Sequence, residues 1–316
     1  MKFTYNWLKE HIKLNIKPEE LALKLTSSGL NVESVTEIKN DFVFDVEITP
    51  NRPDYLSVRG IARLLSAVGA GHYLSSQERA VRELPLQEDE NSHTKDFIKI
   101  DILNPELCKR YTSRILLDVK VEESPEWLKS RLLAVGIRPV NNIVDITNFV
   151  MIDLGHTLHP FDYDLIEGKQ IIIRNAKPKE SIITLDGIKR ELTDNMLVIA
   201  DTSKAIALAG VMGAQNTQIT FSTKNVLLES AYFYPSNIRN TAKFLKMSTE
   251  ASYRFERGAD YEGLVLAINK TTELINSIAG GKTTKGMIDI YPKKFNTVKI
   301  NLRPDRTNKI LGIDID

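Results

Sequence analysis

Apolar residues at helical spacing, followed by a polar segment, mark the stretch from Asn141 to Asp162, NNIVDITNFVMIDLGHTLHPFD, around which the rest of the chain is arranged. Its first half repeats apolar residues three and four positions apart, which predicts a helix with one buried face. Asn142 is the expected N-cap of this helix, and Gly155 its expected left-handed end. The polar segment HTLHPFD follows directly. We therefore expect a buried helix that presents a rigid polar loop, which is a common way to build a site.

The first 74 residues predict a small mixed unit. WLKEHI predicts one helix carrying Trp7 and Ile12, and Pro18 opens a second helix that ends at Gly29. The segments VESVTEI and FVFDVEI alternate like strands and are separated only by Lys-Asn-Asp at 39–41. This spacing predicts a tight β-hairpin.

A turn with two prolines, TPNRPD, precedes the last helix of this unit. The prolines fix an extended turn that orients Arg52 and Asp54. The simplest interpretation is a structural corner in which Asp54 caps the next helix. Residues 75–95 are polar, charged and aperiodic, so we interpret them as a linker between the N-terminal α/β domain (1–74) and a larger domain (96–295).

The larger unit begins with strand patterns and ends with helical ones. FIKIDIL alternates, and SRILLDVKV is its expected partner strand; SPE at 124–126 starts a helix that ends at Gly136. Five further strand segments follow: QIIIRNA, SIITLDGIKREL, MLVIAD, AIALAGVMG and NVLLESAYF. Helices are expected near 236–245 and 263–278. This order predicts an α+β fold with mostly antiparallel sheet. The tail VKINLRPDRTNKILGIDID predicts a strand and a helix, the start of a further, truncated domain at 296–316.

Charge and composition narrow the possible functions. The chain has 42 basic and 41 acidic residues, a net charge of +1, whereas a stand-alone nucleic-acid binder usually has a basic excess. If this chain handles RNA, a partner or another segment must supply most of the affinity. No apolar run is long enough to span a membrane, and the N-terminus lacks the pattern of a signal peptide. The single cysteine, Cys108, excludes an internal disulfide and fits a reducing cytosol; we interpret it as a small buried hydrophobe.

The loop HTLHPFD offers three groups for chemistry, His156, His159 and Asp162. A metal site needs three convergent ligands, and the spacing of the two histidines provides no clear third partner, so we expect no metal here. His159 is the better candidate for acid–base chemistry or for positioning water, because imidazole titrates near neutral pH. A loop held together by hydrogen bonds is the structural alternative.

Two strand segments carry further candidates. LAGVMG places Gly210 and Gly213 at the end of an apolar strand, where glycines allow close approach of a strand or a ligand; the dinucleotide fingerprint is incomplete. Glu229 interrupts the apolar run NVLLESAYF. Either this is an edge strand with Glu229 facing water, or the carboxylate has a role in a site, because an unpaired buried charge is unfavourable. In STEASYRFERG, Glu250 and Arg254 are expected to form an ion pair along a helix.

The residue patterns alone thus predict a cytosolic α+β protein with a candidate site formed by His159, Gly210 and Glu229. They do not predict which class of reaction this site performs. Eight segments in order nevertheless resemble one family, the beta subunit of bacterial phenylalanyl-tRNA synthetase: WLKEHI, ITPNRPDYLSVRGIAR, NNIVDITNFVM, GHTLHPFD, AGVMG, LLESAYF, STEASYRFERG and LRPDRTNKILG. The resemblance covers the whole chain. The family normally inserts an OB-fold tRNA-binding domain between about Ile38 and Phe42, which is replaced here by a few residues, and it continues beyond Asp316.

The resemblance implies that residues 96–295 are a tRNA-editing domain. In the family, editing hydrolyses tyrosine that was wrongly joined to the phenylalanine tRNA. A hydrophobic synthetic pocket cannot strongly reject a side chain that merely adds a hydroxyl, whereas a second site that hydrogen-bonds this hydroxyl can discriminate well. Glu229 resembles the family residue that reads the para-hydroxyl of tyrosine.

Further site residues are implied by the same resemblance, and Thr157 stands where the family commonly has proline. The catalytic candidates are His159, Thr147 and Asn148, and the substrate-binding candidates besides Glu229 are Gly210, Thr249, Ala251 and Thr157. Hydrolysis is expected to use an activated water positioned by His159, with help from pocket backbone amides and the terminal hydroxyl of the tRNA.

The resemblance also implies partners. These are the alpha subunit, in a heterotetramer of two alpha and two beta subunits, and tRNA(Phe), with the tyrosine moiety as the editing substrate. ATP and magnesium belong to the whole synthetase and no cofactor is expected in this chain; the expected location is the cytoplasm. Two alternatives remain open: a non-catalytic fragment that only docks the alpha subunit, and a free-standing trans-editing deacylase.

Overall fold

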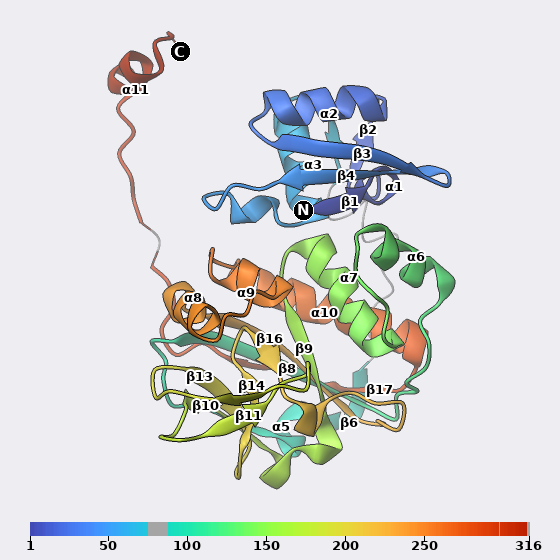
Figure 1. Ribbon diagram of the computed structural model, residues 1–316, viewed down its shortest axis with the longest axis vertical. Coiled ribbons are helices and arrows are strands. Elements are labelled where there is room, and N and C mark those ends of the chain that lie inside the picture. The colour runs from blue at the N-terminus through green and yellow to red at the C-terminus, as the bar shows by residue number, and fades with distance from the viewer. Residues whose placement is uncertain (75–87, 297, 315–316) are drawn as a thin grey trace.

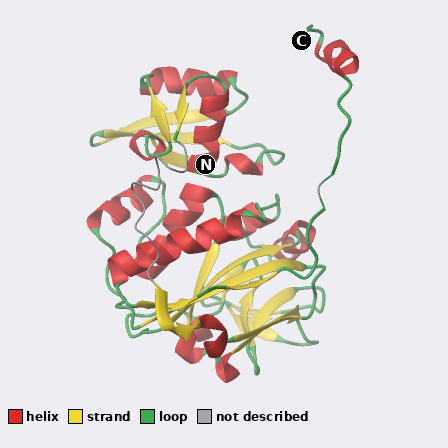
Figure 2. Cartoon of the chain, turned by 180° about the vertical axis from the view of Figure 1, so that it is seen from behind, coloured by secondary structure: helices red, strands yellow, loops and turns green. Residues whose placement is uncertain are grey.

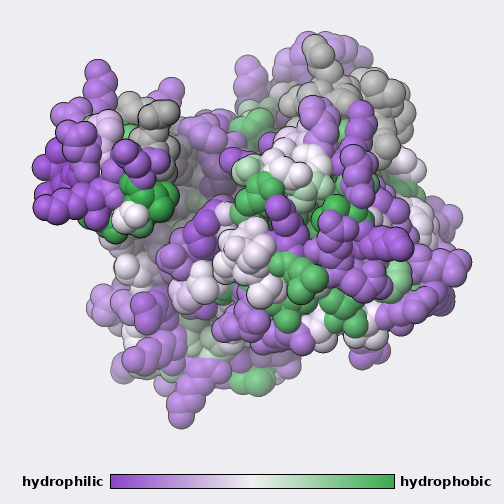
Figure 3. Space-filling view, turned by 90° about the horizontal axis from the view of Figure 1, so that it is seen from above, coloured by the Kyte–Doolittle hydropathy of each residue, from purple (hydrophilic) through white to green (hydrophobic). Residues whose placement is uncertain are grey.

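A computed structural model of the chain describes residues 1–74, 88–296 and 298–314. Three layers follow one another: an N-terminal unit, a layer of helices, and two β-sheets (Figure 1). Seen from behind, the helices again lie between the N-terminal strands and the larger sheets (Figure 2). Most of the face seen from above is hydrophilic (Figure 3). Antiparallel strand pairs predominate, so the predicted α+β class is confirmed.

The N-terminal unit contains a three-stranded antiparallel sheet in the order β1-β4-β3 and a two-stranded sheet of β2 and β5. Its elements are β1 (Lys2–Thr4), α1 (Tyr5–Leu8), β2 (Ile12–Leu14), α2 (Pro18–Ser27), β3 (Asn31–Ile38), β4 (Asp41–Glu47), η1 (Pro53–Tyr55), α3 (Val58–Ala67) and β5 (Gly71–Tyr73). The β3–β4 hairpin was predicted correctly. Ile12, however, lies in β2 and not in the first helix.

The cap of α3 also differs from the prediction. Ser57 is the N-cap, and its Oγ accepts a hydrogen bond from the Gly60 amide at 2.9 Å. Asp54 instead forms an ion pair with Arg52 at 2.7 Å. The expected cap at Asp54 was therefore wrong, because the 3-10 turn η1 places the start of the helix farther along the chain.

The larger part of the chain contains two sheets that pack face to face. The six-stranded sheet contains β6 (Glu88–His93), β8 (Cys108–Leu117), β9 (Leu158–Asp162), β16 (Val226–Phe233), β17 (Lys282–Lys285) and β18 (Ile288–Ile290), in the order β6-β17-β8-β16-β9 with β18 paired to β8. The five-stranded sheet runs β15-β14-β13-β10-β7 and contains β7 (Lys99–Ile102), β10 (Gln170–Asn175), β13 (Leu197–Ala200), β14 (Ala205–Leu208) and β15 (Met212–Gly213). A small hairpin, β11 (Ser181–Ile183) and β12 (Lys189–Glu191), stands beside them.

The remaining elements are α5 (Thr94–Phe97), α6 (Glu126–Ala134), α7 (Asn142–Leu154), η2 (Tyr163–Leu165), η3 (Glu167–Lys169), η4 (Gln215–Thr217), α8 (Pro235–Phe244), α9 (Glu250–Phe255), α10 (Gly263–Ala279) and α11 (Pro304–Leu311). The last of these stands apart from the rest at the end of an extended segment (Figure 1). None of the helices in the described ranges is both long and apolar enough to cross a membrane.

Three expectations need correction. The FIKIDIL strand, β7, pairs in parallel with β10, and SRILLDVKV belongs to β8 in the other sheet. Within the expected linker 75–95, residues 75–87 lie outside the described residues, and Glu88–His93 form β6, which pairs in parallel with β17. In the tail, α11 forms as expected, but the described residues between 298 and 303 contain no strand. The first two expectations were wrong because the pairing of strands that are distant in the sequence is not encoded in the local alternation of apolar and polar residues.

The central helix α7 largely matches its prediction. Asn141, one residue earlier than expected, is the N-cap and accepts from the Val144 amide at 3.0 Å; Gly155 ends the helix at φ +81°. α7 packs on α10 and also shares one hydrophobic core with the N-terminal unit. Buried Asp153 accepts from the Trp7 indole at 2.7 Å and contacts the His11 ring at 2.6 Å. The first 74 residues are therefore tied directly to α7.

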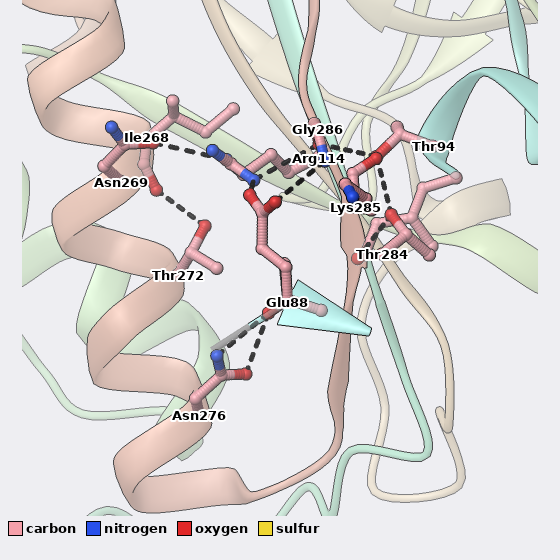
Figure 4. A network of polar contacts seen from close by, with 12 residues as sticks. Glu88, Thr94, Arg114, Ile268, Asn269, Thr272, Asn276, Thr284, Lys285 and Gly286 are labelled. Atoms are coloured by element: carbon pink, nitrogen blue, oxygen red, sulfur yellow. Dashed lines mark hydrogen bonds and ion pairs between the residues drawn. The ribbon is translucent and has the colours of Figure 1, made fainter. Parts of the chain in front are cut away.

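A polar network on the helix-facing side of the six-stranded sheet links its edge strand β6 to β8 and α10 (Figure 4). Buried Arg114, on β8, donates to Glu88 at 2.5 Å, to the Asn269 side chain at 3.2 Å and to the Gly286 carbonyl at 3.2 Å. Glu88 also accepts from the Gly286 amide at 3.1 Å. Burial alone would raise the pKa of Glu88, but its bonds to Arg114 and to the Gly286 amide, together with the positive charges of Arg114 and Lys285, more than offset this and leave the pKa below its usual value.

Candidate functional site

A cavity of about 230 Å³ opens where the two sheets meet α7 and α9. Its polar wall groups come from four segments and are Asn148, Thr157, His159, Glu229, Thr249 and Glu250. Its apolar wall is largely Met151, Ile199, Leu208, Val211, Phe233 and Phe255. Because an enclosed apolar cavity of roughly 150 Å³ is enough to bind benzene, this one has room for a substituted aromatic ring.

Two polar residues of the cavity floor, Glu229 and His159, belong to a row that crosses three neighbouring strands. In the antiparallel register Glu229 on β16 pairs with His159 on β9 and with Ser113 on β8. Directly paired residues project from the same face of a sheet. The preceding row, Ile115, Leu227 and Phe161, is entirely apolar and buried. A polar row thus begins where the inter-sheet core ends.

Glu229 is the most unusual group in this row. It is only 5% exposed, and in the described part of the chain its carboxyl has no hydrogen-bond partner. Burial raises its pKa to about 8, so the carboxyl is largely neutral at pH 7. β16 lies between β8 and β9 and all of its residues are buried, so the alternative of an edge strand facing water was wrong. A buried carboxyl without a partner is unfavourable for folding, which suggests that a ligand supplies the partner.

His159 is held by contacts on both sides of its ring. Its ring lies edge-on to Phe161, with centroids 4.4 Å apart, and a Cβ added to Gly213 would lie 2.3 Å from its Cε1 atom. Only glycine fits at position 213 while the ring stays in place. Burial lowers the pKa of His159 to about 4, so the imidazole is neutral at pH 7. Its buried Nε2 has no partner among the described residues.

Gly210 shapes the opposite wall. Its φ of +66° is a conformation that favours glycine, and an added Cβ would lie 3.0 Å from the Phe255 ring and 3.1 Å from the Phe233 ring. A side chain here would therefore push two aromatic rings of the cavity wall out of place. This agrees with the close backbone approach expected at LAGVMG.

The start of α9 forms a third wall. Thr249 is its N-cap, in a capping box with Ser252, and also donates to the Val211 carbonyl at 2.8 Å. Ala251 follows and lines the cavity with its small side chain. Glu250 and Arg254 form the predicted ion pair at 2.5 Å. The bond to Val211 fixes the start of α9 against the loop after β14, and the capping box fixes the first turn of the helix itself.

The other candidates divide between the cavity and the surrounding structure. Asn148 and Thr157 line the cavity, and neither side chain has a hydrogen-bond partner among the residues described. Thr147 does not line it, and its hydroxyl donates to the Val144 carbonyl at 2.7 Å within α7. The structure therefore gathers seven of the eight candidates around one space: Asn148, Thr157, His159, Gly210, Glu229, Thr249 and Ala251.

The polar residues of HTLHPFD do not converge. His156 is buried edge-on to Phe255, and Asp162 accepts from the Thr223 hydroxyl at 2.6 Å, away from His159. In the described ranges there is no group of three or more histidine, cysteine or acidic residues that could hold a metal ion. Cys108 is buried and free, and burial raises the pKa of its thiol well above the usual value.

Sequence reasoning missed two residues of the site face, Tyr111 and Ser113, and gave Gly213 no specific role. The two hydroxyls alternate along β8 toward the face that carries Glu229. Period-two alternation in CKRYTSRILL is a signal that could have singled them out. Their distance to Glu229 depends on the β8–β16 register, which the sequence alone does not reveal.

Comparison with known proteins decides the family. The model of the B3/4 domain matches residues 107–280, which include β8, β9, β16 and every element around the cavity. The chain belongs to the B3/4 domain family. The B3/4 domain thus supplies all seven cavity candidates, from Asn148 to Ala251.

Curated relatives of this B3/4 domain chain are phenylalanine–tRNA ligase beta subunits. The protein from Moorella thermoacetica is 43% identical over 92% of this chain and 35% of its own length, and that from Carboxydothermus hydrogenoformans is 46% identical over 91% of this chain and 35% of its own length. The resemblance to the bacterial beta subunit is thereby confirmed, and the chain spans about a third of the length of these relatives. An N-terminal fragment of the beta subunit from Pyrococcus horikoshii aligns with all of this chain and 85% of that chain at 14% identity, with a TM-score of 0.44, too distant a likeness to bear on function.

Proposed function

We propose that this chain carries the editing site of a phenylalanyl-tRNA synthetase, which hydrolyses the ester of tyrosine wrongly joined to tRNA(Phe). One observation carries the proposal: an apolar, ring-sized cavity with a single unpaired carboxyl, Glu229, on its floor. A tyrosyl ring would bury its apolar edges against Phe233 and Phe255. Its hydroxyl would then provide the hydrogen-bond partner that Glu229 lacks, whereas a phenylalanyl ring would leave the carboxyl unpaired.

In this proposal His159 positions the water or the ester. A neutral imidazole with a pKa of about 4 is a weak base at neutral pH, so it has little tendency to take a proton from water. Its free Nε2 and the free side chains of Asn148 and Thr157 are suited to holding polar atoms of the reacting ester. Water attacks the ester carbonyl, the bond to the ribose oxygen breaks, and the proton passes to that oxygen, assisted by the neighbouring hydroxyl of the tRNA.

Thr147 has a different role in this arrangement. Its hydroxyl is bonded within α7, so it orients the neighbouring Asn148 and does not touch the substrate. Thr249 and Ala251 limit the width of the cavity. The alpha subunit and tRNA(Phe) are the proposed partners, since a net charge of +1 provides little affinity for RNA alone.

The test is deacylation of preformed tyrosyl- and phenylalanyl-tRNA(Phe) by the chain assembled with its alpha subunit. Glu229→Ala should lower the ratio of kcat/KM for tyrosyl over phenylalanyl ester by about 100-fold, because the hydroxyl loses its partner. The exposed Glu191→Ala serves as the matched control and should leave the ratio unchanged. Unchanged discrimination in Glu229→Ala would refute the role of Glu229.

The same assay separates the two alternatives. A chain that only docks the alpha subunit would hydrolyse neither ester in any assembly. A free-standing deacylase would bind tRNA tightly and hydrolyse tyrosyl-tRNA at the full rate without the alpha subunit.

A further inference from the structure

Two buried hydroxyls stand behind the cavity floor. Ser113 lies directly opposite Glu229 in the β8–β16 pair, and Tyr111 lies two positions along, opposite Ala231. Both therefore project from the face of the sheet that carries Glu229. Neither is exposed and neither lines the cavity, so they form the layer immediately behind its wall.

Within the described residues, neither the Tyr111 hydroxyl nor the Ser113 hydroxyl has a hydrogen-bond partner. Thr112 lies between them on β8 but points to the other face, and its hydroxyl donates to the Ser230 carbonyl at 2.7 Å. The two unpaired hydroxyls are thus confined to the site face. Each unpaired buried hydroxyl lowers the stability of the fold, so stability does not account for two of them on the face that carries Glu229.

The charge of Glu229 acts on Tyr111, which agrees with the strand register that puts both residues on one face of the sheet. Burial raises the pKa of Tyr111 well above its usual value, and the negative charge of Glu229 raises it further. The same charge acts on Cys108, but the Cys108 thiol already has an acceptor, the Arg110 carbonyl at 3.7 Å. Among the described residues of β8, Tyr111 and Ser113 thus have hydroxyl donors without a partner on the face that carries Glu229.

We infer that Tyr111 and Ser113 are positioning residues for substrate specificity, whose hydroxyls donate to the Glu229 carboxyl when a tyrosyl group occupies the cavity. The inference rests on the proposed editing function. A protonated carboxyl has one O–H donor and still has lone pairs on its oxygens, so it can accept from both hydroxyls and still pair with the para-hydroxyl of tyrosine. Two fixed donors would hold the carboxyl in one orientation and increase the penalty for a ring without a hydroxyl.

The test uses Tyr111→Phe and Ser113→Ala in the chain assembled with its alpha subunit. Each variant should lower the tyrosyl-over-phenylalanyl ratio of kcat/KM about tenfold, through a higher KM for the tyrosyl ester and an unchanged rate for the phenylalanyl ester. Thr112→Val, which removes the hydroxyl on the other face, should leave the ratio unchanged. A ratio within about twofold of wild type in both site-face variants, or an equal fall for both esters, would overturn the inference.

Two further measurements separate this inference from the proposed function. In a Glu229→Ala background, adding Tyr111→Phe should change the ratio less than about twofold, and a further tenfold fall would contradict action through Glu229. If Glu229→Ala loses discrimination while both hydroxyl variants keep it, the inference fails and the proposed function stands. Tyr111→Phe should melt at or above the wild-type temperature, because it removes an unpaired group; a lower melting temperature would show that the hydroxyl serves the fold.

Discussion

The two faces of the six-stranded sheet differ in their buried polar groups, which are paired on one face and unpaired on the other. On the face toward the helices, Arg114 is paired with Glu88, Asn269 and the Gly286 carbonyl (Figure 4). On the face toward the other sheet, the buried Ser113 hydroxyl has no partner among the described residues, although Ser113 is the immediate neighbour of Arg114 on β8. Burial alone acts on the pKa of Glu229 there, with no contribution from a hydrogen bond.

Neighbouring residues of one strand, β8, therefore serve different purposes: those on one face stabilise the fold, and those on the other face are available to bind a ligand. Paired polar groups contribute to a unique fold because breaking one bond leaves the other partner buried and unpaired. Unpaired groups lower stability, so proteins keep them chiefly where a ligand completes them. Changes on the helix side should therefore affect folding, and changes on the cavity side should affect catalysis.

The largest effect is expected on the paired face. Arg114→Met should lower the free energy of unfolding by about 3 kcal/mol, because Glu88 is left partly buried without its cation. Urea denaturation measures this, and the tyrosyl-over-phenylalanyl ratio of the folded fraction should not change. Lys99→Met, which breaks an exposed ion pair with Asp101, is the control and should cost less than about 1 kcal/mol. A changed tyrosyl-over-phenylalanyl ratio of kcat/KM in Arg114→Met would show that the paired face also affects specificity and would contradict this comparison.

On the cavity face, Gly213→Ala should reduce tyrosyl-tRNA deacylation about 100-fold, because the new Cβ would displace the His159 ring. Gly136→Ala provides the control: its φ of +83° is strained by a side chain, but no atom lies within 4 Å of the added Cβ. It should lower stability and leave the deacylation rate of the folded enzyme unchanged. Wild-type rates in Gly213→Ala would show that the position of the His159 ring does not matter.

The next effect depends on pH. Glu229 keeps its proton in the folded state up to about pH 8, while in the unfolded chain it ionises near pH 4.5, so the folded state binds more protons between these values. The free energy of unfolding should therefore fall with rising pH, by up to roughly 1.4 kcal/mol per pH unit, relative to Glu229→Gln. Urea denaturation of both proteins at pH 6.5 and 7.5 measures the difference. Parallel pH profiles would mean that Glu229 is ionised in the folded protein.

The smallest effect concerns the cap of α9. Thr249→Ala removes the capping box and the bond to the Val211 carbonyl and should cost about 1 kcal/mol. Thr249→Ser keeps the hydroxyl and should restore most of this stability. Thermal melting compares the two, and equal melting temperatures would show that the cap contributes little.

Local pattern predicted local structure well. The apolar spacing of α7 and the glycine at its end appeared as expected, and so did the β3–β4 hairpin, because helix periodicity and turn chemistry are encoded within a few residues. The partner of β7 was predicted wrongly, since pairing between distant strands depends on the whole fold. For the same reason Ser113 was missed: nothing near it in the sequence indicates that it lies opposite Glu229.

The bonds of Asp153 to Trp7 and His11 have a practical consequence. Burial alone would raise the pKa of Asp153, but the attraction of His11 together with the hydrogen bonds from His11 and Trp7 and the charge of Lys270 more than offsets this, so the pKa lies below its usual value and the carboxylate is charged inside the protein. A shortened protein beginning at residue 96 would lack both partners and would expose the apolar side of α7 to water. Since α7 also provides Asn148 and Met151 to the cavity, isolating the cavity-bearing part for binding studies or crystallisation requires the first 74 residues to be kept with it.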